Sequence, residues 1–176
     1  MVIRLLLADL DALTNNGQLI TKIKCILISH CFHMQVLMRL GCWIHSVVPR
    51  FGSPFRIIIE YLIRILFASD ISCKATIGGG LMVMHGHDIV IGSQVVIGKR
   101  CLIMNSVTLG NKYIGPGVQT RQPVIGDSVQ IGVGAKILGP VHIGDRSAIG
   151  ANAVVLSDVP DDSVAVGIPA KIYKKK

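Results

Sequence analysis

From Ile77 onward an aliphatic residue recurs at almost every sixth position, and this period restricts the fold more than any other feature of the chain. Most of these residues are followed directly by Gly. A six-residue period suits a chain that makes a short strand, turns by about a third of a circle and repeats. It predicts a parallel β-helix with a column of aliphatic side chains inside. The residues in phase are Ile77, Val83, Ile91, Ile97, Ile103, Leu109, Ile125, Ile131, Ile137, Ile143, Ile149 and Val155.

The six-residue step fails in two places, and each failure predicts an irregular segment where a site can form. Between Val83 and Ile91 the step is eight residues, so two extra residues lie within 84–88. Between Leu109 and Ile125 the step is sixteen residues, which is two repeats plus four. The second excess predicts a protruding loop over 111–123.

The chain before residue 70 has a helical pattern instead. Apolar residues recur three or four positions apart around 19–48 and 55–67, and two prolines bracket the break between these segments. Arg56, Glu60 and Arg64 recur every four residues, and we interpret them as a solvated polar stripe on an apolar helix. We therefore expect a mainly β chain, with a short α-helical region over 1–69 and a β-helix over 70–176.

The net charge and the hydropathy of the chain restrict the kinds of partner it can bind and its location in the cell. The net charge of +8 favours an anionic partner, which a phosphorylated cofactor or a membrane surface would supply. No nucleic-acid recognition motif is found, so nucleic acid is not expected as a partner. No apolar run reaches the length of a membrane span, and Asp9 and Asp11 interrupt the apolar start, which favours a cytoplasmic protein. The five cysteines lack metal-site spacing and are interpreted as buried cytosolic thiols.

Several short motifs between residues 70 and 171 add a family resemblance to this pattern. They are Asp70-Ile71, Ala75-Thr76-Ile77-Gly78, Met84-His85-Gly86, Val107-Thr108-Leu109-Gly110, Ile131-Gly132-Val133-Gly134-Ala135-Lys136, Ile149-Gly150-Ala151 and Val166-Gly167-Ile168-Pro169-Ala170. With these motifs the segment resembles the serine acetyltransferases and the related polysaccharide O-acetyltransferases of the colanic acid type. The resemblance implies a left-handed β-helix, acetyl-CoA as co-substrate, and a homotrimer that binds it between neighbouring coils.

The same resemblance implies the catalytic residues. An alcohol is a poor nucleophile at neutral pH, so a base must take its proton as the oxygen attacks a thioester. His85 matches the base of the family, and Asp70 matches the carboxylate that orients it, with Asp88 close enough in sequence to serve instead. No metal is expected, because a three-histidine zinc site would need His87 and His142 as well, and His142 lies in an ordinary repeat turn.

Three further positions match the cofactor groove of the family, and three more carry side chains suited to the thioester end or the phosphates of the cofactor. Small side chains are needed where the pantetheine arm lies on the coil, an amide can hydrogen-bond the thioester end, and lysines can meet the phosphates. These positions are Gly110, Val133 and Ala151 for the arm, Asn111 for the thioester, and Lys136 and Lys171 for the phosphates.

The acceptor positions depart from the serine acetyltransferase pattern. The serine pocket of that family has an Asp directly before the base and an Arg-His pair in the protruding loop, whereas this chain has Met84 and the pair Arg121 and Gln122. Without a carboxylate the ammonium group of serine has no obvious partner. We therefore predict that the acceptor is a sugar hydroxyl of a polysaccharide or its precursor. The alternatives are a divergent serine acetyltransferase and, less favoured, a non-catalytic β-helix scaffold.

Overall fold

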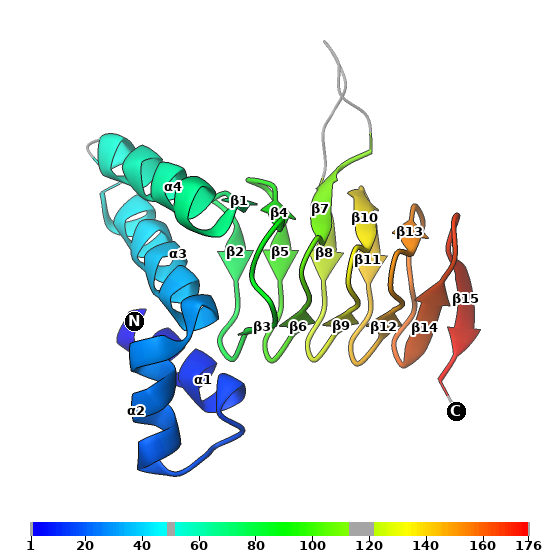
Figure 1. The fold of residues 1–176 in the computed structure, drawn as a ribbon. Coiled ribbons are helices and arrows are strands. Elements are labelled where there is room, and N and C mark those ends of the chain that lie inside the picture. Colours follow the sequence, from blue (N-terminus) through cyan, green and yellow to red (C-terminus); the bar gives the residue numbers. More distant parts are fainter. Residues whose placement is uncertain (1, 49–51, 113–121, 176) are drawn as a thin grey trace.

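A layer of helices closes one end of a three-sided coil (Figure 1). The structure is a computed structural model that describes residues 2–48, 52–112 and 122–175. The break between the second and third helices falls at Ser29, whose hydroxyl accepts a hydrogen bond from the backbone N–H of Phe32 and so caps the third helix. The helices are α1 (Val2–Leu13), α2 (Leu19–Ile28), α3 (His30–Val47) and α4 (Ser53–Phe67).

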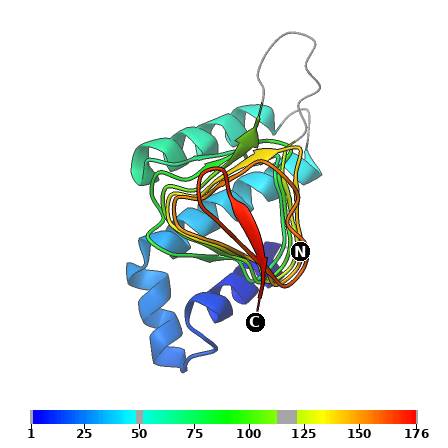
Figure 2. The same cartoon turned by 90° about the vertical axis from the view of Figure 1, so that its right-hand side faces the viewer.

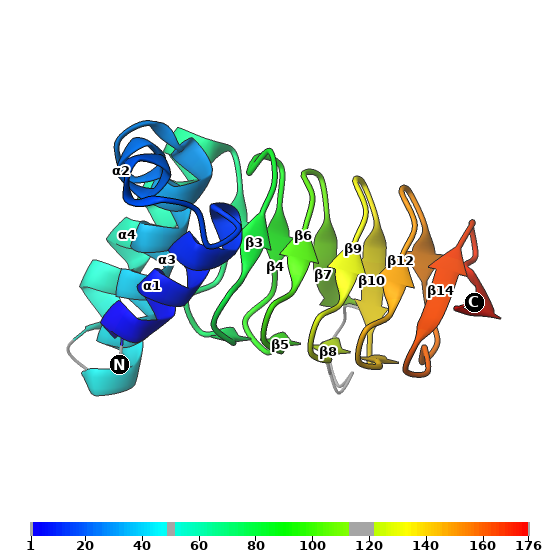
Figure 3. The same cartoon turned by 90° about the horizontal axis from the view of Figure 1, so that it is seen from below.

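The coil has three faces, each a sheet, and as far as β13 every third strand of the chain pairs in parallel (Figures 1 and 3). The first face contains β1, β4, β7, β10 and β13, and the second contains β2, β5, β8 and β11. The third face contains β3, β6, β9, β12 and β14, and the antiparallel strand β15 completes it. The strands are β1 (Asp70–Ile71), β2 (Thr76–Ile77), β3 (Met82–Val83), β4 (Val90–Ile91), β5 (Val96–Ile97), β6 (Leu102–Ile103), β7 (Thr108–Asn111), β8 (Val124–Ile125), β9 (Gln130–Ile131), β10 (Lys136–Gly139), β11 (His142–Ile143), β12 (Ala148–Ile149), β13 (Val154–Val155), β14 (Ser163–Val166) and β15 (Lys171–Lys174).

The column of aliphatic residues predicted from the six-residue period is confirmed, because all twelve residues are buried. A second inward column was not predicted. It lies two residues before each member of the first and is made mostly of small or β-branched side chains, which fit the tight corners of the coil. Examples are Ala75, Val95, Val107, Val129, Ala135 and Ala153.

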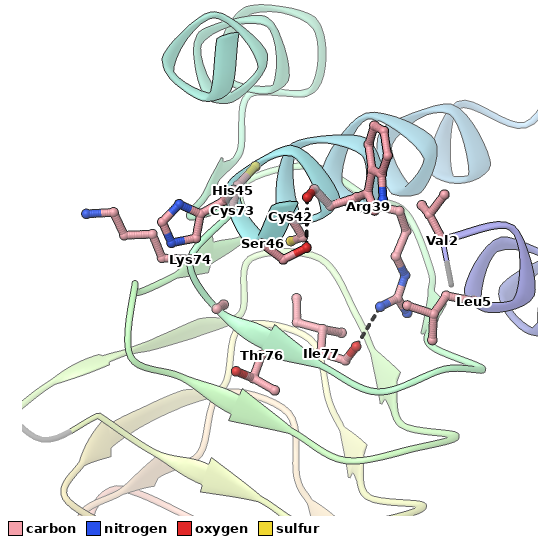
Figure 4. A pocket seen from close by; sticks show the side chains of 12 residues that line it. Val2, Leu5, Arg39, Cys42, His45, Ser46, Cys73, Lys74, Thr76 and Ile77 are labelled. Atoms are coloured by element: carbon pink, nitrogen blue, oxygen red, sulfur yellow. Dashed lines mark hydrogen bonds between the residues drawn. The ribbon is translucent and has the colours of Figure 1, made fainter. Parts of the chain in front are cut away.

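The helices satisfy the backbone groups of the first coil, which has no preceding coil to pair with. Buried Arg39 donates to the carbonyl of Ile77 at 2.6 Å (Figure 4) and to that of Gly78 at 2.6 Å. It also forms an ion pair with buried Asp9. Asp9 also accepts from the backbone N–H of Leu81 at 2.9 Å. The edge of the first coil is therefore covered by polar side chains rather than left open.

The polar stripe on α4 is not the solvated face that the sequence suggested. Glu60 is part-buried, pairs with Arg56 and accepts a 2.8 Å hydrogen bond from the backbone N–H of Cys73 in the first coil. Sequence spacing alone could not reveal this contact, because the partner lies thirteen positions away in a turn of the coil.

The structure confirms the predicted burial for three of the five cysteines and not for the other two. Cys31, Cys73 and Cys101 are buried as expected, but Cys25 and Cys42 are only half-buried, and all five are free thiols.

Within the described ranges, no helix by itself has the length and apolar character to cross a bilayer. The helices α2 and α3 reach that length and apolar character only when taken together, as a pair bent by 76°.

Candidate active site

His85 lies exposed on a turn between β3 and β4. The turn packs against α3, because the backbone N–H of Gly86 donates to the Cys31 sulfur at 3.3 Å and a Cβ at Gly86 would lie 2.9 Å from the end of Met34. The next coil holds the turn from the other side through the backbone N–H of Ser106, which donates to the His87 carbonyl at 3.1 Å. His85 itself has a left-handed backbone, with φ of 55°, which directs its side chain out of the regular coil.

Asp70, the predicted partner of His85, is paired with a different residue. Its carboxylate accepts a 2.8 Å hydrogen bond from Arg64, and this contact raises the pKa of the Arg64 guanidinium. Within the described chain neither Asp70 nor Asp88 hydrogen-bonds to the His85 ring. The backbone of the His85 turn does contact the segment just before β1, because the N–H of Asp88 donates to the Ala68 carbonyl at 3.0 Å. The structure thus brings the His85 turn beside the start of β1 without joining the two side chains.

Two of the predicted cofactor residues share one corner with His85. This corner joins the third face to the first, and we call it the His85 corner; its turns are residues 84–88, 104–106, 132–134 and 150–152. These turns lie one above the next along the coil, because backbone hydrogen bonds join them. The N–H of Gly134 donates to the Asn105 carbonyl, and the N–H of Asn152 donates to the Val133 carbonyl. Val133 and Ala151 are exposed here, one coil apart. They form a shallow wall of small side chains beyond His85.

Gly110 and Asn111 lie at the opposite edge of the first face. They end β7, whose start is near the His85 corner, so the two groups are separated by about four to five residues of extended chain, roughly 13–17 Å. The side-chain oxygen of Asn111 is buried and has no hydrogen-bond partner among the described residues. Such an orphaned acceptor costs free energy unless a ligand or a neighbouring chain supplies a donor.

The two predicted phosphate-binding lysines differ in their surroundings. The Lys136 ammonium donates to the Ser106 carbonyl at 2.5 Å, so it is held against the His85 corner. Lys171 is exposed at the start of β15, at the far end of the coil from the helices (Figure 1). Only Lys136 is therefore near the turn that carries His85.

The residues predicted to contact the acceptor also lie in different surroundings. Met84 is exposed directly beside His85. Gln122 instead holds a turn of the coil, because its side-chain oxygen accepts a 2.8 Å hydrogen bond from the backbone N–H of Gln94. Arg121 lies outside the described residues, as does most of the protruding loop. Within the described part of the chain, no three His, Cys, Asp or Glu side chains converge as a metal site would require.

Comparisons with known proteins agree with this architecture. Residues 122–157 match the family described as bacterial transferase hexapeptide (six repeats), and residues 88–114 match the hexapeptide repeat of succinyl-transferase. The chain is 37% identical over 147 residues to a serine acetyltransferase of Synechococcus elongatus, covering 80% of this chain and 56% of the relative. It thus spans little more than half the length of that relative.

Solved structures extend the similarity to nearly the whole chain. Soybean serine acetyltransferase complexed with serine superposes with a TM-score of 0.87 at 34% identity, covering 98% of this chain and 69% of the soybean chain. A serine acetyltransferase complexed with CoA gives a TM-score of 0.83 at 30% identity, covering 98% and 69% of the two chains.

Proposed function

Since this chain belongs to the hexapeptide-repeat acyltransferase superfamily and is similar to serine acetyltransferases, we propose that it transfers the acetyl group of acetyl-CoA to a hydroxyl oxygen. The observation that carries the proposal is the exposed His85 ring on a turn fixed by α3 and by the next coil. His85 takes the hydroxyl proton while the oxygen bonds to the thioester carbonyl carbon. The carbon–sulfur bond then breaks, and the CoA sulfur leaves with that proton from the imidazolium.

We assign the orienting role to Asp70. An imidazole that gains a proton in the transition state is stabilised by a carboxylate on its other nitrogen. Asp70 begins the strand next to the His85 turn, and its pairing with Arg64 is between half-exposed side chains. An exposed ion pair of this kind contributes little free energy, about 0.2–1 kcal/mol, so Asp70 can exchange Arg64 for His85 at small cost.

Acetyl-CoA fits two features of this chain. Small residues at the His85 corner leave room for a narrow arm along the coil, and the orphaned Asn111 oxygen needs a donor such as a pantetheine amide N–H. A serine acetyltransferase of this fold has been solved with CoA, which supports the same ligand class. We place Val133, Ala151, Gly110 and Asn111 along the cofactor, and Lys136 beside it.

The separation of these residues supports a homotrimer. His85, Val133 and Ala151 lie at one edge of the first face, while Gly110 and Asn111 lie at the other. In a rotationally symmetric assembly, one edge of one protomer meets the opposite edge of its neighbour, so both sets line one groove. Light scattering on the active protein tests this, and an active monomer would exclude a shared site. We also infer a left-handed coil, and a boundary between the helical region and the coil near residue 69.

For the acceptor, we place L-serine first. Similarity to serine acetyltransferases, including one solved with serine, supports this alternative better than the sugar hydroxyl that we predicted from the sequence. The sugar remains a second candidate because of one observation. The exposed side chain next to His85 is that of Met84, which offers no charge to an ammonium group.

The experiment that tests both candidates is an acetyl-transfer assay with purified protein, acetyl-CoA and a panel of acceptors. Formation of O-acetylserine at millimolar serine supports the first candidate, and transfer only to sugars or glycans supports the second. The variant Met84→Asp separates them further, because a carboxylate beside His85 should raise turnover of serine and not of a neutral sugar. No thioester cleavage with any acceptor, together with no binding of acetyl-CoA, would leave only a scaffold role.

A further inference from the structure

The outward face of the helical layer is apolar, and α2 is its most exposed element. None of the ten residues of α2 is buried, and the helix reaches beyond the outline of the coil (Figure 2). Its large aliphatic side chains are 44–77% exposed, the extremes being Ile26 and Ile28. Single exposed apolar residues are common on protein surfaces, but a helix made mostly of them needs a covering surface.

A groove joins α2 to the rest of the layer. Its volume is about 660 Å³, and its walls are Ile26 from α2, Val36 and Leu37 from α3, and Leu66 from α4. Leu66 and its neighbour Ile65 are 62% and 60% exposed on α4, so the apolar surface continues from α2 across the groove. Three helices therefore contribute to one apolar surface at the end of the molecule.

The free charge beside this surface is positive. Of the acidic residues on the four helices, Asp9 is buried against Arg39, Glu60 faces the first coil, and Asp11 pairs with Lys22. Lys24 is exposed on α2 and forms no ion pair among the described residues. Apolar side chains flanked by lysine suit a membrane surface that carries negative headgroups.

We propose that α2 and the adjoining groove dock on the surface of an anionic lipid bilayer. A ten-residue helix is too short to span a bilayer, but it can lie in the interface with its aliphatic side chains among the acyl chains. A second copy of the same face is a poorer occupant, because it would bring the unpaired Lys24 charges of both copies into one apolar interface. Docking would also place His85 near the lipid, because its turn packs on Cys31 and Met34 of α3.

Vesicle co-sedimentation of the full chain tests this proposal, with phosphatidylcholine vesicles that either lack or contain phosphatidylglycerol. We expect binding to the anionic vesicles to be at least about tenfold stronger and to weaken with salt. The double substitution Leu27→Glu and Ile28→Glu should reduce binding by about a hundredfold or more, since each removes a large aliphatic contact. Lys24→Glu should cause a smaller loss. Ile168→Glu is the matched control, because Ile168 is 73% exposed at the other end of the coil and should leave binding unchanged.

Three results would overturn the proposal. Wild-type protein that stays in the supernatant with anionic vesicles excludes a lipid partner. A double variant that sediments as well as the wild type excludes α2 as the docking element. A double variant with a lower mass in light scattering than the wild type, both measured without lipid, shows that another copy of this chain covers α2. Turnover of a water-soluble acceptor, measured in parallel, reports on the proposed enzyme activity independently of lipid binding.

Discussion

Arg64 donates a 2.8 Å hydrogen bond to Asp70, the carboxylate that we propose orients His85. Both side chains are more than half exposed, so the pair competes weakly with any other partner of Asp70. We expect Arg64→Met to leave turnover unchanged or to raise it by up to about fivefold, because it frees the carboxylate. Asp70→Asn should lower turnover by about tenfold or more. Steady-state kinetics of the two variants decide the matter, and an equal loss in both would mean that the pair itself, rather than free Asp70, supports activity.

Replacing His85 with Gln should lower turnover by about two to four orders of magnitude and leave the Kd for acetyl-CoA nearly unchanged. Glutamine keeps a polar side chain of similar size at the turn but cannot take a proton at neutral pH. His87→Gln is the matched control, because His87 is exposed on the same turn and has no proposed role. Near-normal turnover in the His85 variant would remove it as the base.

Replacing Asn111 with Ala should raise the Kd for acetyl-CoA by about two- to twelvefold, the range for the loss of one hydrogen bond. The buried side-chain oxygen has no partner among the described residues, so a bound ligand is the simplest source of a donor. Isothermal titration measures the change, with Gln130→Ala on the third face as a control. If the trimer falls apart instead, the donor to Asn111 comes from a neighbouring chain.

Cys42 should be alkylated before Cys73 and Cys101. The hydrogen bond with the Cys73 thiol lowers the pKa of Cys42, whereas that hydrogen bond and burial raise the pKa of Cys73, and burial raises that of Cys101. The thiolate is the reactive form, so a lowered pKa means faster labelling at pH values below the ordinary thiol value. The two thiols line one cavity with Arg39 (Figure 4).

The rate of Cys42 labelling against pH, followed by mass spectrometry of iodoacetamide-treated protein, measures this effect. In the variant Cys73→Ala the curve should move to higher pH, because the largest cause of the lowered pKa is gone. Labelling of Cys42 with an unchanged pH midpoint in that variant would contradict the assigned cause.

Asp9→Asn should lower the free energy of unfolding by about 3–5 kcal/mol, because it leaves the Arg39 charge buried without its counterion. Asp11→Asn is the comparison, since Asp11 pairs with Lys22 at the surface and its loss should cost less than about 1 kcal/mol. Urea denaturation of both variants gives the two values. Similar losses would mean that the Asp9 pair contributes no more than a surface pair.

Sequence reasoning identified the features that repeat and missed those that depend on neighbours in space. The six-residue period gave the buried column from Ile77 to Val155, and its interruption drew attention to the segment of His85. The period could not predict that Gln122 stabilises a turn of the coil, because the backbone N–H that its side chain accepts from, that of Gln94, belongs to the preceding coil. The pairing of Glu60 with a turn of the coil was hidden for the same reason, since its spacing with Arg56 fits a solvated helix equally well.

The polar contacts of Arg39 and Asp9 with the first coil also limit how this chain can change in length. One circuit of the coil takes three repeats, so inserting or deleting a whole circuit returns every later strand to its own face. A change of a single repeat would instead rotate everything downstream by one face, and His85 would no longer share a corner with Val133 and Ala151. Because the helices are fastened to one end only, the coil behaves as a modular rod with an anchored start, whose length can be varied in steps of one full circuit.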